Sequence, residues 1–223
     1  MRVQPGLGTL PPLFQALSTV DRGLLRDTGR LAMLGKGERL IRAGQIVDTV
    51  AFIYAGWVAL ESRGVSVLLL RPGETCLNAF DLEARRSDVD VRAMSPASVA
   101  LIDRRALRGL LPRYPEVFYT LFQRVMQRVE SLFIAQARQG PDPLEVRLAW
   151  LLWTLGEPEA DGTRRVSNEV PQSVLASLLG ASREEINRKR RMLMRAGFII
   201  PDTDGTRLAA SIALLLGAHD YPV

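Results

Sequence analysis

The feature that most constrains the fold is a pair of short helical patterns joined by a glycine, which lies within residues 171–208. A proline opens the first pattern and predicts a helix over 172–179, because proline suits the first helical position. Gly180 supplies a turn. Ser182, with a glutamate three residues later, has the spacing of a capping box and predicts the start of a second helix. A hairpin pattern over 198–208 follows, and this order predicts a winged helix-turn-helix.

The second helix of this pair has two chemically different faces, because residues three and four apart share one side of a helix. Apolar residues predict the inner faces of both helices: Val174, Leu175, Leu178 and Leu179 on the first, Ile186 and Leu193 on the second. The opposite face of the second helix carries side chains able to pair with base edges in a major groove, and these are the predicted base contacts: Arg183, Glu184, Asn187 and Arg188.

Other polar side chains near this helix predict contacts to phosphate, which add affinity without sequence information: Ser182, Lys189, Arg191 and Arg195. The positive charge near this helix is a local concentration, because the C-terminal part of the chain as a whole is not basic. Residues 1–140 hold 19 Lys and Arg against 13 Asp and Glu, whereas residues 141–223 hold 10 against 11. A solvated basic helix is the alternative interpretation, and the capped start after a glycine turn favours DNA binding over it.

Short apolar runs broken by glycine fill the region from about Gly35 to Asp103. Runs such as Val50–Leu60 and Val65–Leu70, with turn residues between them, predict an antiparallel barrel or roll. Ahead of this region, Leu13–Leu34 has helical spacing, with Asp21 as a candidate cap for a second short helix.

A long amphipathic helix is predicted from near Pro115 to Gly140-Pro141. Its apolar positions have a nearly coiled-coil spacing: Phe118, Leu121, Val125, Val129 and Leu132. Such a stripe packs either on its own β domain or on the same helix of a second copy, and we favour the dimer. The predicted division of the chain is a β-roll domain over 1–111, a dimerisation helix over 112–140 and a winged-helix domain over 141–223.

Composition argues against several other classes of protein. Cys76 is the single cysteine and His219 the single histidine, so the sequence predicts no disulfide, no metal site and no iron–sulfur cluster. No phosphate loop, dinucleotide fingerprint or nucleophile–base arrangement is present, and we do not expect an enzyme. An apolar run long enough to cross a bilayer and a signal peptide are both missing from the sequence, which predicts a cytoplasmic protein without a membrane partner.

The segment Ser182-Arg-Glu-Glu-Ile-Asn-Arg188 resembles the recognition-helix motif of the CRP/FNR superfamily of transcription regulators. In that motif an arginine, a glutamate and a second arginine read the half-site, and these roles fall on Arg183, Glu184 and Arg188. The resemblance extends over nearly the whole chain and implies an α+β protein with an N-terminal antiparallel β-roll, a dimerisation helix and a C-terminal winged helix-turn-helix. It also implies double-stranded DNA, a second copy of the chain and RNA polymerase as partners. Arg190 departs from the family, which usually has an apolar residue there, and we expect its head group to extend outward to solvent.

The predicted effector pocket also departs from the family. Cyclic-nucleotide-binding members hold their ligand through a Gly-Glu pair and an Arg-Ser or Arg-Thr pair, and the corresponding positions here are Leu77-Asn78 and Ser87-Asp88. Asp88 would repel a phosphate, although a one-residue insertion would place Arg86-Ser87 there instead. We therefore expect no response to cyclic AMP or cyclic GMP.

Cys76 lies near the position where haem-containing members place a cysteine ligand, but no histidine is close in the sequence, so we expect neither haem nor another cofactor. Redox sensing through this thiol is a further alternative, and would need a low thiol pKa and exposure. A ligand-sensing or protein-docking module without specific DNA binding is the rival interpretation of the whole chain.

Overall fold

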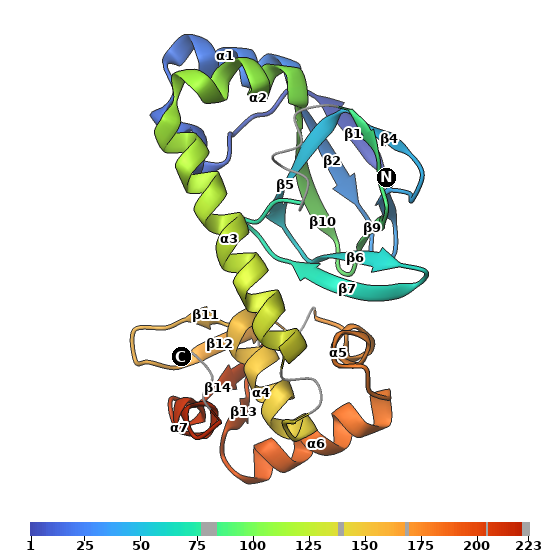
Figure 1. Ribbon diagram of the computed structural model, residues 1–223, viewed down its shortest axis with the longest axis vertical. Coiled ribbons are helices and arrows are strands. Elements are labelled where there is room, and N and C mark those ends of the chain that lie inside the picture. Colours follow the sequence, from blue (N-terminus) through green and yellow to red (C-terminus); the bar gives the residue numbers. More distant parts are fainter. Residues whose placement is uncertain (77–83, 138–140, 168–169, 204, 220–223) are drawn as a thin grey trace. The chain divides into compact units, whose positions relative to one another are not determined.

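The computed structural model describes residues 1–76, 84–137, 141–167, 170–203 and 205–219 (Figure 1). Two compact units are present, Met1–Glu130 and Ser131–Val223. The division falls inside a single helix, α3 (Pro115–Ala137). The two units do not separate a dimerisation helix from its neighbours, as the predicted three-part division does, and that division stays a prediction. The helix itself is confirmed: it begins at Pro115 as expected, and its described part ends at Ala137, three residues before Gly140.

Unit 1 contains β-strands and short helices in the order β1 Arg2–Pro5, η1 Pro12–Ala16, α1 Thr19–Thr28, β2 Arg30–Leu34, β3 Arg39–Ile41, β4 Ile46–Val47, β5 Thr49–Ala55, β6 Val58–Ser62, β7 Val65–Leu70, β8 Arg85–Arg86, β9 Asp90–Ala93, β10 Ala97–Asp103, α2 Arg104–Leu110, η2 Leu111–Arg113 and the first part of α3. The strands form sheets of order β1-β2-β10-β5, β3-β9-β6-β7 and β4-β8, and their pairings are antiparallel. This confirms the predicted roll.

The core of unit 1 lies between the first sheet and the helices at its end (Figure 1). Phe14 of η1 meets Phe52 of β5 edge to face, with ring centroids 5.3 Å apart. Leu25 of α1, Leu107 of α2 and Leu121 of α3 are buried in the same cluster. Burial of these apolar surfaces is the main force that holds the helices on the sheet.

Two features of unit 1 differ from the sequence interpretation. The helical spacing over Leu13–Leu34 covers only η1 and α1, because Arg30–Leu34 is strand β2. Ser18, rather than Asp21, caps α1: its hydroxyl oxygen accepts a hydrogen bond from the Asp21 N–H at 3.1 Å. The apolar run Val50–Leu60 is also two strands, β5 and β6, which are separated at Gly56. That glycine has a φ of +77°, and a side chain there would collide with the Pro96 carbonyl oxygen.

Asp21 joins α1 to the start of α3. Its carboxylate accepts hydrogen bonds from the Tyr114 hydroxyl at 2.6 Å, the Arg113 guanidinium at 2.9 Å and the Ser18 hydroxyl at 3.0 Å. The Tyr114 hydrogen bond holds the pKa of this carboxyl below its usual value of 3.8, against partial burial, which acts to raise it; Ser18 and Arg113 lower it further.

Asp21→Asn is expected to lower the melting temperature of unit 1 at neutral pH. Because the folded pKa is lowered, the stabilisation is present above the unfolded pKa of 3.8 and is lost as the pH falls through the lower folded value. The melting temperatures of variant and wild type should therefore converge at low pH. Thermal unfolding followed by circular dichroism at several pH values measures this. Asp27→Asn, an exposed carboxylate on the same helix, is the control and should change little; equal shifts in both variants would contradict this account.

Unit 2 contains the last part of α3 and then α4 Leu144–Leu155, β11 Glu157–Pro158, β12 Arg164–Ser167, α5 Gln172–Leu179, α6 Arg183–Arg195, β13 Ile199–Pro201, β14 Gly205–Leu208 and α7 Ile212–Gly217. Its strands form one antiparallel sheet of order β11-β12-β14-β13. The predicted hairpin after Gly197 is confirmed as β13 and β14. The sequence did not indicate that β12 would pair with β14 and extend this hairpin.

Candidate nucleic-acid interface

The turn between α5 and α6 has the geometry that its sequence predicts. Gly180 adopts a left-handed conformation with a φ of +61° and ends α5. Ser182 and Glu185 form a complete capping box at the start of α6. The Ser182 hydroxyl oxygen accepts from the Glu185 N–H at 3.2 Å, and the Glu185 carboxylate accepts from the Ser182 N–H at 2.9 Å. The hydrogen bonds that the Ser182 N–H and the Ser182 hydroxyl donate to this carboxylate hold the pKa of Glu185 below its usual value. The start of α6 is therefore well defined.

Apolar side chains hold α6 against the rest of unit 2. Ile186 and Leu193, which are seven residues apart, are both fully buried on the inner side of the helix. Val174, Leu175 and Leu179 of α5 are buried as predicted, whereas Leu178 is only partly covered. The helix packs against α4, α5 and β13. This packing leaves one long side of α6 in contact with solvent.

The predicted base contacts lie on that solvent side. Arg183, Glu184 and Arg188 are exposed, and Asn187 is partly covered. Arg191 and Arg195 are exposed too, and Ser182 is exposed at the helix start. Arginine can pair with guanine O6 and N7, glutamate can accept from cytosine N4, and asparagine can read adenine. A helix that offers these groups together has the chemistry needed to read a major groove.

Lys189 does not fit its predicted role. Its ammonium nitrogen lies 2.7 Å from a carboxylate oxygen of Glu145, in the first turn of α4. This contact lowers the pKa of Glu145 against the effect of burial, which acts to raise it. Because the charge of Lys189 is already paired inside its own domain, the structure argues against a phosphate contact at this position.

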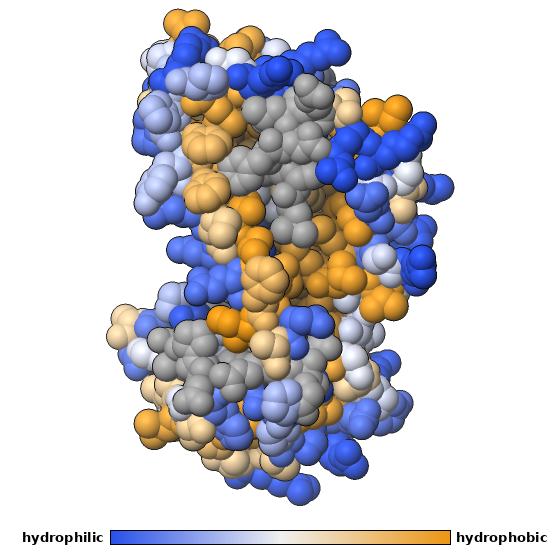
Figure 2. Space-filling view, in the orientation of Figure 1, coloured by the Kyte–Doolittle hydropathy of each residue, from blue (hydrophilic) through white to orange (hydrophobic). Residues whose placement is uncertain are grey.

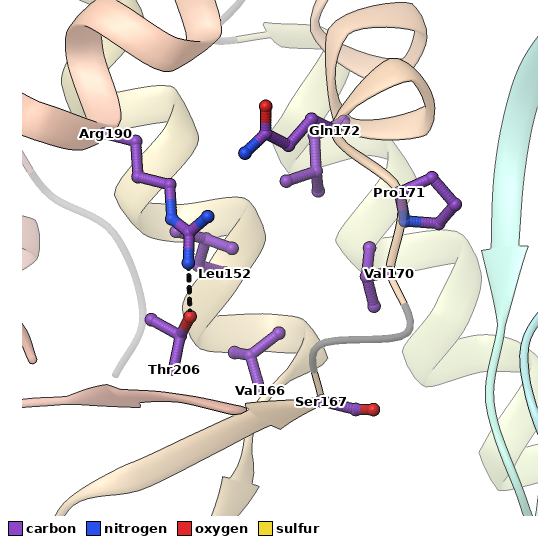
Figure 3. A pocket seen from close by; sticks show the side chains of 9 residues that line it. Leu152, Val166, Ser167, Val170, Pro171, Gln172, Arg190 and Thr206 are labelled. Atoms are coloured by element: carbon purple, nitrogen blue, oxygen red, sulfur yellow. Dashed lines mark hydrogen bonds between the residues drawn. The ribbon is translucent and has the colours of Figure 1, made fainter. Parts of the chain in front are cut away.

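Arg190 also differs from the expectation that its head group extends to solvent. Its guanidinium donates a hydrogen bond of 2.6 Å to the hydroxyl of Thr206 on β14. Figure 3 shows this contact beside a cavity of about 180 Å³ that Val166, Gln172 and Leu175 also line. The side chain therefore points inward, toward the wing. Neither Thr206 nor Glu145 could be identified from spacing, because both partners come from elements distant in the sequence.

Ion pairs link the paired strands β11 and β12 to the hairpin of β13 and β14 in the sheet of unit 2. Arg165 of β12 pairs with Glu159 at 2.7 Å and with Asp202 at 3.1 Å. Arg207 of β14 lies 3.4 Å from Asp202. Glu159 and Asp202, which lie in the connections between the paired strands, are thus paired with arginines of the same sheet.

The exposed apolar side of α3 differs by one position from the predicted stripe. Leu121 is 1% exposed and belongs to the core of unit 1, so it is not available to a second copy. The neighbouring Phe122 is 45% exposed, and its ring stacks on that of Phe118 with centroids 6.3 Å apart. Phe118, Tyr119, Phe122 and Met126 are the exposed residues that we call the α3 stripe. Val125, Val129 and Leu132 are partly covered. Figure 2 shows apolar side chains along the course of this helix.

A second cavity, of about 370 Å³, lies in unit 1 at the position of the predicted effector pocket. Its described lining consists of Ile41, Leu60, Val67, Cys76, Arg85, Arg86, Ser87, Asp88, Val89 and Val91. Arg85 pairs with Asp88 at 2.9 Å, and Arg86 donates to the Gly44 carbonyl at 2.9 Å. The predicted pocket residues Leu77 and Asn78 lie outside the described residues. Arg86, Ser87 and Asp88 do come together, but both arginines already have partners.

Cys76 lines this cavity and is 4% exposed. Burial raises the pKa of its thiol to about 12, despite the charge of Arg104, which acts to lower it. The group is therefore a protonated thiol at neutral pH, and an easily oxidised thiolate is not expected. Among the described residues, no group of three or more side chains has the arrangement of a metal site. In the same part of the chain, no helix meets the length and hydropathy needed to span a bilayer.

The helix pair joined at Gly180, the wing and the β-roll define a class of two-unit, helix-turn-helix DNA-binding proteins, and comparisons with known proteins agree. Residues 146–213 match the Crp-like helix-turn-helix domain. This match covers the helix-turn-helix and the wing of unit 2. The chain is 27% identical over 202 residues to the HTH-type transcriptional regulator Cmr of Mycobacterium tuberculosis (strain CDC 1551 / Oshkosh), covering 85% of this chain and 80% of Cmr.

Solved structures show the same fold at low sequence identity. FixK2 from Bradyrhizobium japonicum superimposes with a TM-score of 0.71 at 15% identity, covering 88% of this chain and 99% of FixK2. A CooA variant from Carboxydothermus hydrogenoformans gives 0.67 at 13% identity, covering 96% and 97%. A cyclic nucleotide-binding domain containing protein from Listeria monocytogenes EGD-e gives 0.67 at 18% identity, covering 86% and 97%. These likenesses confirm the predicted fold class, with its N-terminal β-rich domain and C-terminal helix-turn-helix.

Proposed function

We propose that this chain is a sequence-specific transcription regulator that binds a palindromic operator as a homodimer. The observation that carries the proposal is the solvent side of α6, where Arg183, Glu184 and Arg188 project together from a capped helix start. Two copies related by a twofold axis would present two such helices to half-sites about one helical turn apart. RNA polymerase is the further partner that we propose for such a regulator.

The homodimer is supported by the α3 stripe. Four large apolar side chains in contact with solvent on one helix are unusual for a surface that functions alone. Their spacing allows two α3 helices to pack side by side, with aromatic rings at the centre of the contact. Leu121 is not part of this contact in our proposal, because it fills the core of its own unit.

The proposal is tested by titrating the full chain with a duplex selected from a random library and with a scrambled duplex of the same length. Selection of an inverted repeat, with preference over the scrambled duplex, is the expected result. Affinity for both duplexes should fall steeply with salt, because phosphate contacts release counterions. Absence of duplex binding at low salt would overturn the proposal and favour the rival function, a ligand-sensing or protein-docking module, for which the cavity of unit 1 provides a site.

Cyclic AMP and cyclic GMP are not expected to bind the cavity of unit 1, and we propose that it holds neither haem nor another cofactor. Asp88 in the lining disfavours a phosphate, and the guanidinium groups of Arg85 and Arg86 are engaged by Asp88 and Gly44. Isothermal titration calorimetry of the full chain should give no saturable heat with either nucleotide. Asp88→Ala tests the reason: if repulsion by this carboxylate matters, the variant should gain measurable binding. Micromolar binding by the wild type would contradict the prediction.

A further inference from the structure

Two polar contacts leave α6 from consecutive residues and reach different elements. Lys189 contacts Glu145 of α4, and Arg190 contacts Thr206 of β14. Both residues are partly covered, whereas Arg183, Glu184 and Arg188 of the proposed base contacts are exposed. We call this pair of contacts the lateral contacts of α6.

Helix geometry places the lateral contacts on opposite sides of the buried stripe. At about 100° per residue, Ile186 and Leu193 lie on nearly the same line, Lys189 lies about 60° to one side of Ile186, and Arg190 lies about 40° to the other. Ile186 and Leu193 hold this line of the helix against the rest of unit 2, and the lateral contacts add a polar restraint on either side of it. The Arg190–Thr206 hydrogen bond is directional, and the Lys189–Glu145 ion pair lies on the other side of the stripe, so the two contacts together oppose rotation in both directions.

The surroundings of Arg190 make its hydrogen bond important for its position. The side chain borders the cavity of about 180 Å³ instead of being packed on all sides (Figure 3). In such a space a long side chain has several available rotamers, and the Thr206 hydroxyl selects one of them. Thr206 itself is 4% exposed, so it acts on α6 from inside the domain and is not in a position to contact DNA.

We propose that Lys189 and Arg190 are positioning residues that set the rotation of α6 about its own axis. In this way they determine which side chains of α6 face the base edges. This inference rests on the proposed function, since it concerns how the same helix reads its operator. Direct readout depends on good hydrogen-bond geometry, so a small rotation weakens base contacts more than it weakens phosphate contacts, which tolerate a range of geometries.

The sharpest test is Thr206→Val in the full chain, because valine keeps the shape and strand preference of threonine and removes only the hydroxyl. We expect the preference for the selected operator over the scrambled duplex to fall by about fivefold or more, the net scale of one ordinary hydrogen bond. Affinity for the scrambled duplex and the slope of log affinity against log salt should stay unchanged. Thr206→Ser keeps the hydroxyl and should restore the preference.

Glu145→Ala tests the Lys189 contact in the same assay. Glu145→Gln, which keeps an oxygen acceptor for Lys189, is its matched control. Arg195→Ala should instead weaken both duplexes equally and reduce the salt slope by about two, one for each copy in the proposed dimer. The inference is overturned if Thr206→Val and Glu145→Ala keep the wild-type preference while the wild type itself is specific. It is also overturned if Arg190→Met reduces the salt slope, which would make Arg190 a phosphate contact. A wild type with no operator preference would instead reject the proposed function. If thermal unfolding shows that the variant at one of the two lateral contacts does not fold, the variant at the other contact decides whether the inference holds.

Discussion

Replacing Arg183 or Arg188 by alanine is expected to reduce affinity for the selected operator by roughly ten- to a hundredfold, while affinity for a scrambled duplex changes little. A bidentate arginine–guanine contact provides about 1–3 kcal/mol of discrimination against the wrong base, which corresponds to this range. In a homodimer each substitution is present twice, so the loss should lie toward the upper end. Electrophoretic mobility shift with both duplexes at fixed salt measures the effect.

The fold should not change in these variants, because both side chains are exposed and lie away from the buried Ile186 and Leu193. Arg191→Ala is the matched control from the same side of α6, and should weaken both duplexes by a similar factor as a phosphate contact. Unchanged sequence preference in both Arg183→Ala and Arg188→Ala would refute the roles assigned to these residues.

Phe122→Glu is expected to convert a dimer into a monomer and to lower operator affinity by about a hundredfold or more. The substitution places a charge in the middle of the α3 stripe, and glutamate is a good helix former, so α3 itself should remain intact. Loss of the second half-site contact removes the gain in affinity that linked binding sites provide. Light scattering after size exclusion should report the chain mass of 24.7 kDa for the variant and twice that mass for the wild type.

Leu121→Ala, one residue away, separates this effect from general damage to the helix. Leu121 is in the core of unit 1, so its truncation should destabilise that unit by about 2–5 kcal/mol and leave the mass of the folded fraction unchanged. A wild type that is monomeric at all concentrations, or a Phe122→Glu variant that remains dimeric, would contradict the proposed interface.

Local sequence patterns predicted much of this structure. Ser182 and Glu185 mark a helix start through contacts between neighbours in the chain, and Gly180 marks a turn through its backbone freedom, so both could be identified directly. Residues in contact with partners distant in the sequence could not. Lys189 and Arg190 looked like a basic surface because nothing local indicates Glu145 or Thr206 as their partners.

The sequence alone also could not predict which of Leu121 and Phe122 is buried and which is exposed. Both fit a helical apolar pattern, and only the position of the β-roll decides which of them enters its core. The helical prediction for Arg30–Leu34 fails for the same reason, because Leu31 and Leu34 have helical spacing while their strand partners lie in β1 and β10. Tertiary contacts overrode the local pattern in each case.

The measurement that tests the central claim most directly is a methylation-interference footprint of the full chain on its selected operator. Because α6 is proposed to read guanine N7 and O6 in the major groove, methylation of guanine N7 should block binding at symmetric positions in two half-sites about one helical turn apart. Arg183→Ala or Arg188→Ala should abolish the interference at specific guanines and leave the others. Interference that is absent, confined to the minor groove, or unaffected by both substitutions would contradict the account of α6 as the element that reads the operator.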